Sequence, residues 1–280
     1  MFATASLAAR IERAECSMLQ ELAGAVRARL GAASDVVLEP VGGGVAVYAG
    51  EGSPINKLAG LGFGAVPDAS QLDRIERAFA ERNASIQAEL SSLADPAVGR
   101  LLTDRGYALI GFENLFGLPL DASMPAADTG EVEISPAAAD EARAWMDAVA
   151  TGFMHPDTYD GPPSHETYSR EAIENIFIDT IATPSFERFI ARRAGAVAGG
   201  ASLRLDGGVA QLAGAATVPE HRRRGVQSAL LRQRLASAAA RGCDVAIVTT
   251  SPGSKSAQNI QRFGFVLLYV RAILVKAAAG

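Results

Sequence analysis

Two segments of similar design lie far apart in the sequence, and this internal repeat limits the possible folds more than any other feature. The first, LLTDRGYALIGFENLFGLPL, covers residues 101–120, and the second, NIQRFGFVLLYVRAILVKA, covers residues 259–277. In each, a short helix is expected to end near an arginine, after which a glycine and an aromatic residue open an apolar strand. Chance similarity between two α/β segments is the alternative. A duplication predicts two related folds arranged about a pseudo-twofold axis.

The length and composition agree with two domains. The chain has 280 residues, 49% of them hydrophobic and 20% charged, which is enough apolar material for two packed cores. Residues 119–131 are rich in Pro, Ala and Asp and show no hydrophobic period, so they predict a linker near 123–130. We expect a first domain over residues 1–125 and a second over residues 131–280.

Hydrophobic periodicity predicts an α/β arrangement in both halves. In the second half we expect strands at 132–135, 186–192, 196–205, 209–218 and 245–250, helices at 137–153, 166–181, 225–241 and 254–263, and two closing strands within 265–276. In the first half we expect helices at 71–81 and 96–104, a strand at 85–90, and an apolar segment at 108–120. The glycine run at 42–44 fits a hairpin turn, with a phosphate cradle as the alternative.

Charge and cysteine content exclude several classes of protein. The net charge of −5 argues against a nucleic-acid binder, which needs a basic surplus to neutralise phosphates. No apolar run is long enough to cross a membrane. Arg10 and Glu12 interrupt the N-terminal segment, which therefore lacks the unbroken apolar core of a secretory signal. Cys16 and Cys243 are far apart and form neither a disulfide framework nor a metal motif. We therefore expect a cytoplasmic, globular protein without a metal site.

The segment TVPEHRRRGVQSALL, residues 217–231, contains the most concentrated positive charge of the second half. It joins the end of a predicted strand to the start of a predicted helix. The first amide groups of a helix have no acceptor within the helix and lie at its positive end, so they can bind a diphosphate. Gly225 would let the backbone approach phosphate oxygens, and the arginines add forked donors. The alternative is a solvated helix cap whose arginines contact surface carboxylates.

Arg222-Arg223-Arg224-Gly225-Val226-Gln227 resembles the Gln/Arg-x-x-Gly-x-Gly/Ala loop of the GCN5-related N-acetyltransferase (GNAT) superfamily. The resemblance covers residues 131–280 and includes the Gly264-Phe265 pair after the next helix. It implies a mixed, mostly antiparallel sheet flanked by helices in each of two GNAT-like domains, and acetyl-CoA as co-substrate. The residues that it places on the cofactor are Thr217, Val218, Arg222, Arg223, Arg224, Gly225, Val226, Gln227 and Ser228. Gln227 departs from the motif, which is tolerable if its side chain points away from the ligand.

The first half lacks the corresponding charges. Residues 61–76 hold Gly62 and Gly64 before a helix, but no Lys or Arg lies between Lys57 and Arg74, and Asp68 adds a negative charge. A diphosphate would be repelled there. We expect the N-terminal half to be a degenerate copy of the fold, as in tandem acetyltransferases.

The resemblance implies direct attack of an amine on the thioester, which needs a base for the amine proton, a donor for the oxyanion and an acid for the leaving thiolate. A backbone amide around Thr217–Val218 is the expected oxyanion donor. The strand at 209–218 contains no carboxylate, and the loop at 154–166, which the resemblance places along the acceptor cleft, offers His155, Asp157, Asp160 and His165. We choose His155 as the base because histidine titrates near neutral pH and this one lies beside the end of the first predicted helix. A capping or packing role is the alternative for this histidine.

For the acid, the position where the family often has tyrosine is Ile260. Tyr269 is the candidate instead, and a core tyrosine with its hydroxyl bonded to the backbone is the alternative.

The sequence thus predicts an N-acetyltransferase that acts on the amine of a small molecule or peptide. A non-catalytic acyl-CoA-binding regulatory module is the alternative. The sequence leaves the acceptor and the oligomeric state open.

Overall fold

The computed structural model describes residues 1–121, 129–157 and 168–278, and it begins with a long helix that the sequence patterns do not predict. This helix is α1 (Ala5–Leu30). The other elements of the first half are β1 (Val37–Val41), β2 (Gly44–Tyr48), β3 (Lys57–Ala59), α2 (Ala69–Ala80), β4 (Ile86–Ser91), α3 (Pro96–Asp104) and β5 (Ala108–Pro119). The helices and strands expected in this half are present, and Gly42-Gly43 is the turn between β1 and β2, which confirms the hairpin prediction.

The second half follows the predicted order of elements with one correction. Its elements are β6 (Glu133–Pro136), α4 (Ala142–Met154), α5 (Arg170–Ala182), β7 (Phe186–Arg193), β8 (Ala196–Asp206), β9 (Val209–Thr217), α6 (Val226–Ala240), β10 (Val245–Thr250), α7 (Lys255–Arg262) and β11 (Val266–Lys276). The prediction of two closing strands is wrong, because β11 is a single strand. No Gly, Pro, Asn or Asp interrupts it, so nothing in its sequence forms a turn. Most of the expected linker, residues 122–128, lies outside the described residues.

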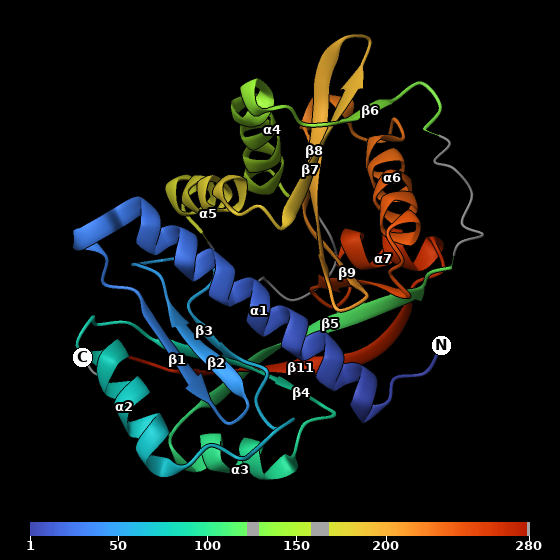
Figure 1. Ribbon diagram of the computed structural model, residues 1–280. Coiled ribbons are helices and arrows are strands. Elements are labelled where there is room, and N and C mark those ends of the chain that lie inside the picture. Colours follow the sequence, from blue (N-terminus) through green and yellow to red (C-terminus); the bar gives the residue numbers. More distant parts are fainter. Residues whose placement is uncertain (122–128, 158–167, 279–280) are drawn as a thin grey trace.

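The described strands form one sheet, and the two halves exchange strands at its centre (Figure 1). The order is β1-β2-β3-β4-β11-β5-β10-β9-β8-β7-β6. β11 of the second half lies between β4 and β5, and β5 of the first half lies between β11 and β10. From the centre outwards, β11-β4-β3-β2-β1 therefore corresponds to β5-β10-β9-β8-β7. Each half contains one parallel pair, β3 with β4 and β9 with β10, among antiparallel neighbours. This symmetry is the pseudo-twofold arrangement that a duplication predicts.

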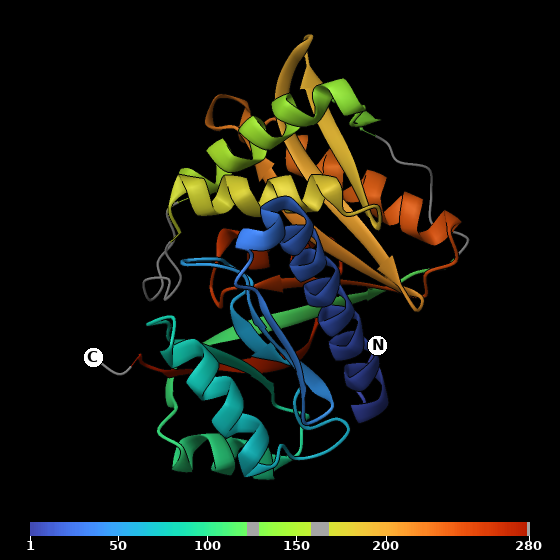
Figure 2. The ribbon, with the colours of Figure 1, turned by 60° about the vertical axis from the view of Figure 1, so that its left-hand side comes forward.

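Helices cover both faces of the sheet. On one face, Ala8, Ile11 and Ala14 of α1 pack on the central strands, and α4 and α5 cover the strands of the second half. Figures 1 and 2 show α1 and α5 close together on this side, where Arg29 pairs with Asp179 at 2.8 Å. On the other face, α2 and α3 cover the first half and α6 and α7 the second. None of the described helices is long and apolar enough to cross a membrane.

A buried group of charges joins α1 to the exchanged strands. Nε of Arg271 on β11 lies 2.9 Å from Oε1 of Glu12 on α1, and its Nη1 lies 3.3 Å from Glu89 on β4 and 3.2 Å from Glu113 on β5. Lys57 on β3 pairs with Glu89 at 2.6 Å. Burial, followed by the charge of Glu89, raises the pKa of Glu113 to about 8. One arginine thus holds together elements from both halves.

Candidate functional site

The opening between β9 and β10 is the main feature of the candidate site. The two parallel strands are paired only from Val209, opposite Val245, to Gln211, opposite Ile247. β9 continues to Thr217 alongside β8, and β10 continues to Thr250 alongside β5. Beyond the paired residues, β9 remains hydrogen-bonded to β8 and β10 to β5, while β9 and β10 separate from each other. The edges that face the opening therefore have main-chain groups for an extended ligand to bind as a strand would.

A β-bulge in β9 accompanies the separation of the strands. Gly200 on β8 is opposite Ala216, but Ser202, two residues on, is opposite Ala213, so β9 holds one extra residue. Gly214 in the bulge has a φ of +53°, a left-handed conformation that glycine adopts without strain. Bulges bend a strand and increase its twist, which is how β9 leaves β10.

Side chains from both faces satisfy the carbonyl groups at the bulge. Nε1 of Trp145 on α4 donates to the carbonyl of Ala201 at 3.2 Å, and Oγ of Ser202 donates to the carbonyl of Ala213 at 3.0 Å. From α6, Nη1 of Arg234 donates to the carbonyl of Ser202 at 3.1 Å. Arg234 is buried, and burial lowers its pKa to about 10. Residue type alone does not identify Trp145 and Arg234, because the carbonyl groups that they contact depend on the register of β8 with β9.

The start of α6 lies next to the opening and has no side-chain cap. Among the described helices, α1, α2, α3, α5 and α7 begin at a residue whose side chain caps the first turn, namely Thr4, Asp68, Asp95, Ser169 and Ser254. α6 begins at Gly225, with a φ of +81° and no side-chain cap. A Cβ at Gly225 would have no atom within 4 Å, so the space beside it is open. Arg223 and Arg224 are exposed there. This combination fits an anionic group such as a diphosphate.

The corresponding helix start in the first half is closed. The carboxylate of Asp68 accepts from the amide of Gln71 at 2.7 Å, and the Gln71 side chain bonds back, which completes a capping box. The β1–β2 hairpin also packs here, since a Cβ at Gly42 would lie 2.6 Å from Cγ of Pro67. A carboxylate thus takes the place that an anion would need, in line with a degenerate copy.

Comparison with known proteins identifies the second half. Residues 149–265 match the model of the Acetyltransferase (GNAT) family. These residues form a GNAT domain. The family consists of N-acetyltransferases that use acyl-CoA, generally acetyl-CoA, as donor. No curated protein matches the chain.

Solved structures share the fold. A GCN5-related N-acetyltransferase from Kribbella flavida has a TM-score of 0.64 at 21% identity and covers 97% of this chain and 96% of that chain. A tandem GNAT protein from the clavulanic acid biosynthesis pathway has a TM-score of 0.59 at 11% identity over 88% and 84%. A GCN5-related N-acetyltransferase from Sphaerobacter thermophilus has a TM-score of 0.56 at 16% identity over 75% and 67%. The expected fold of two GNAT-like units is confirmed, and here the units share one sheet.

The structure brings the predicted cofactor residues together around the opening. Thr217 ends β9, and Val226 to Ser228 form the first turn of α6. The amide of Val218 donates to the carbonyl of Ala198 at 3.1 Å, and because such bonds alternate along an antiparallel strand, the amide of Thr217 points away from β8. Gln227 turns towards α7, where its Oε1 accepts from Asn259 at 2.8 Å. The side chain that departs from the GNAT motif thus has a partner away from the backbone amides.

Arg222 connects the GNAT loop to the end of α4. Its guanidinium donates to the carbonyl of His155 and lies 3.4 Å from Oδ1 of Asp157. Arg222 thus matches the alternative of an arginine that contacts a surface carboxylate. Arg223 and Arg224 form no ion pair with any residue that the structure describes.

His155 follows α4 near the end of β9. Nδ1 of this exposed side chain lies 3.0 Å from the carbonyl of Thr151, and because a carbonyl only accepts, Nδ1 is the donor; in the neutral ring this leaves the free electron pair on Nε2. One turn earlier, a Cβ at Gly152 would lie 3.2 Å from the carbonyl oxygen of Thr217, so α4 touches the end of β9. Asp160 and His165 lie outside the described residues.

Tyr269 lies in the interior, on the α1 face of β11. Its hydroxyl donates to Oε1 of Glu12 at 2.7 Å, and its ring is buried. Leu115 of β5 separates it from Thr249 of β10, which places it two strand spacings, about 10 Å, from β10. Burial, followed by the charge of Glu12, raises the pKa of its phenol well above the ordinary value. The surroundings resemble those of the core tyrosine considered as the alternative, with a carboxylate as partner.

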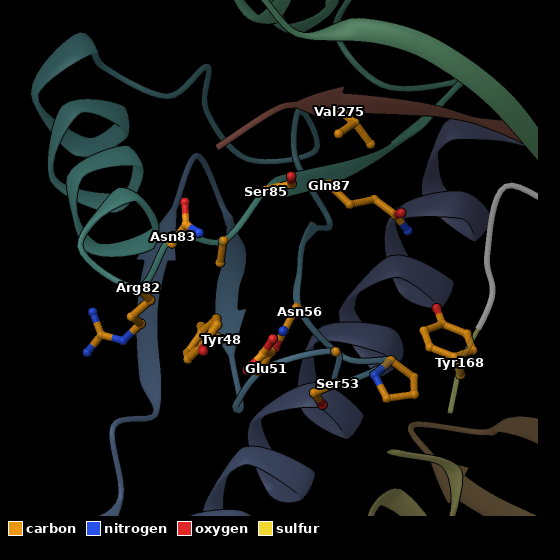
Figure 3. A pocket seen from close by; sticks show the side chains of 13 residues that line it. Tyr48, Glu51, Ser53, Asn56, Arg82, Asn83, Ser85, Gln87, Tyr168 and Val275 are labelled. Carbon is orange, nitrogen blue, oxygen red and sulfur yellow. The ribbon is translucent and has the colours of Figure 1, made fainter. Parts of the chain in front are cut away.

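A separate hollow of about 490 Å³ lies between the first half and the start of α5 (Figure 3). Tyr48 and Tyr168 both line it, and the guanidinium of Arg82 lies 5.4 Å from the centre of the Tyr48 ring. Val275, which lines the hollow, pairs with Ala108 of β5, whereas Thr250 at the opening pairs with Asn114 of the same strand. Six residues separate Ala108 from Asn114, so the hollow and the opening are about 20 Å apart along β5. The hollow is thus distinct from the opening between β9 and β10.

Proposed function

We propose that this chain is an enzyme that transfers an acetyl group from acetyl-CoA to the amine of a small-molecule or peptide acceptor. The observation that carries the proposal is the opening between β9 and β10 beside the uncapped start of α6. An extended arm with a diphosphate at one end and a thioester at the other matches this combination of open strand edges and an anion site.

The roles of the binding residues follow from their positions. The first amide groups of α6 bind the diphosphate, and Arg223 and Arg224 add positive charge and donors. The edge of β9 near Thr217 binds the arm that leads to the thioester. The Thr217 amide is also the candidate donor to the oxyanion that develops on the carbonyl, since the Val218 amide already has a partner in Ala198.

We assign the base to Nε2 of His155. The amine attacks the thioester carbon as a neutral nucleophile, and Nε2 accepts its proton while Nδ1 is held by the Thr151 carbonyl. His155→Ala should lower kcat by roughly 100-fold with little change in melting temperature. Unchanged turnover would remove His155 from the mechanism.

Tyr269→Phe tests the proposed acid. If the phenol protonates the leaving thiolate, Tyr269→Phe should lower kcat without lowering the stability of the protein. Because the hydroxyl donates to buried Glu12, we expect instead a loss of about 1–3 kcal/mol in the free energy of unfolding and little change in kcat.

Turnover with a panel of amines distinguishes an enzyme from an acyl-CoA-binding regulatory module. Release of free thiol from acetyl-CoA is followed with each amine. An enzyme releases CoA only when a suitable amine is present, whereas a regulatory module binds acetyl-CoA without releasing it. Binding of acetyl-CoA without release across the panel would favour the regulatory module.

Calorimetry tests the anion site itself. Arg224→Glu should weaken acetyl-CoA binding by about tenfold at low ionic strength and by less at high salt. Arg100→Glu, at an exposed position of α3, is the matched control and should leave the affinity unchanged. Equal affinities for wild type and Arg224→Glu would contradict the proposed diphosphate site.

A further inference from the structure

A buried hydroxyl without a partner lies at the end of β10. Thr250 is 5% exposed, and its Oγ1 hydrogen-bonds to none of the described residues. A buried hydroxyl group normally has a hydrogen-bond partner, because leaving one unpaired costs free energy. Such a group at a functional opening points to a ligand atom as its partner.

The pairing of the strands places Thr250 across the opening from the bulge. β10 is paired with β9 up to Ile247, opposite Gln211. Three residues further along each strand, Thr250 and Gly214 stand on the two sides of the opening. Thr250 is itself fixed on its other side by pairing with Asn114 of β5. The hydroxyl therefore stands on a rigid strand beside the region where the arm of the donor would lie.

Alternation along β10 settles which face of the sheet Thr250 occupies. Val245 and Ile247 pack under α1, whereas Ala246 and Val248 pack with α6 and α7. Because successive side chains in a strand point to opposite faces, Thr250 lies on the side of α6 and α7 and Thr249 on the other. The face that carries the Thr250 hydroxyl is thus the face from which α6 presents its first amide groups.

We propose that Thr250 is a catalytic residue that donates a hydrogen bond from Oγ1 to the sulfur atom of the thioester. This inference rests on the proposed function. In the reaction, the amine nitrogen bonds to the carbonyl carbon, the carbon–sulfur bond breaks, and its electron pair stays on sulfur. The amine proton goes to the base, Thr250 keeps its own proton, and the thiolate takes a proton from solvent after release. A donor to the sulfur stabilises the charge that develops there.

Two substitutions and a matched control isolate the hydroxyl. Thr250→Val keeps the shape and removes the donor, and Thr250→Ser keeps the donor. Thr249→Val, at the exposed neighbour on the opposite face, is the control. We expect Thr250→Val to lower kcat by roughly 10- to 100-fold, Thr250→Ser to recover most of that loss because it restores the donor, and Thr249→Val to stay near wild type. The melting temperature of Thr250→Val should equal or exceed that of wild type, because the substitution removes an unpaired buried polar group.

Calorimetry with CoA and desulfo-CoA, in which hydrogen replaces the thiol, gives a readout independent of turnover. Wild type should bind CoA more tightly than desulfo-CoA, and Thr250→Val should abolish this difference while it keeps its affinity for desulfo-CoA. If wild type binds neither ligand, the proposed function itself fails. If both proteins bind both ligands and Thr250→Val still prefers CoA, the assignment of Thr250 is overturned while the proposed function stands. An unchanged kcat in Thr250→Val has the same meaning. A melting temperature several degrees lower in Thr250→Val also overturns it, because the hydroxyl would then have a partner within the protein.

Discussion

Replacing Gly152 by alanine would add a methyl group where α4 touches the end of β9. An ideal Cβ at Gly152 lies 2.4 Å from Cβ of Ala216 and 3.2 Å from the carbonyl oxygen of Thr217. Carbon atoms in contact stay about 3.5–4.0 Å apart. The helix and the strand must therefore separate by about 1 Å, because Cβ of Ala216 is attached directly to the backbone of β9 and cannot rotate away.

The net effect on stability is the difference of two contributions. Overpacking of this kind costs about 1–3 kcal/mol, and alanine in place of glycine within a helix returns about 0.5–1 kcal/mol. We expect a net loss of up to about 2.5 kcal/mol, which corresponds to a fall in melting temperature of up to about 5–10 °C. Gly24→Ala is the matched control, because Gly24 is an exposed glycine within α1 whose added Cβ would have no atom within 4 Å. Gly24→Ala should stabilise the protein by about 0.5–1 kcal/mol.

The same displacement should affect the reaction. α4 leads directly to His155, and a shift of about 1 Å in a positioning element can lower the rate by up to about 100-fold. Thermal unfolding followed by circular dichroism measures the first effect, and kcat/KM for the best amine measures the second. If Gly152→Ala is as stable as Gly24→Ala and keeps the wild-type kcat/KM, the close contact between α4 and β9 does not position the site.

Three further outcomes are expected. Calorimetric titration should give one mole of acetyl-CoA bound per chain, since Asp68 closes the helix start of the first half; a ratio of two would contradict the degenerate copy. Glu113 has a pKa of about 8 in the folded protein, so the folded state binds more protons than the unfolded state and the free energy of unfolding should fall as pH rises from about 4.5 to about 8. Glu113→Gln should flatten that dependence in urea titrations, unlike Glu133→Gln at an exposed position, and parallel curves would exclude Glu113 as its source. Arg271→Met should cost about 3–5 kcal/mol in urea unfolding, because it leaves Glu12 and other buried carboxylates without their cation, and a loss below about 1 kcal/mol would show that the network is dispensable.

Much of the second half could be predicted because local patterns decide it. Asp206-Gly207-Gly208 forms the turn between β8 and β9, and the alternation of apolar residues marks the strands on either side. The proposed anion site at Gly225 also follows from local information, since it needs only a basic loop before a helix. Local patterns do not predict α1, because Glu12 and Glu15 interrupt its apolar face and both are buried against Arg271, which is distant in sequence.

Pairing between distant strands is the part that local patterns do not determine. β5 and β11 have similar sequences, which indicates a duplication, but either strand could have completed the sheet of its own half. The bulge in β9 depends in the same way on its register with β8. The carbonyl groups that Trp145 and Arg234 satisfy follow from that register and could not be predicted from their residue types. The Thr250 hydroxyl, which has no partner among the described residues, depends likewise on how β10 pairs with distant strands.

The exchange of β5 and β11 also has a consequence for biosynthesis. As the chain leaves the ribosome, β4 remains the open edge of the first half until the last strand of the second half has been translated. The second half in turn needs β5, which is made earlier, to cover the edge of β10. The first half therefore cannot be deleted by a simple truncation, because its loss would leave the β5 side of β10 unpaired and open to aggregation.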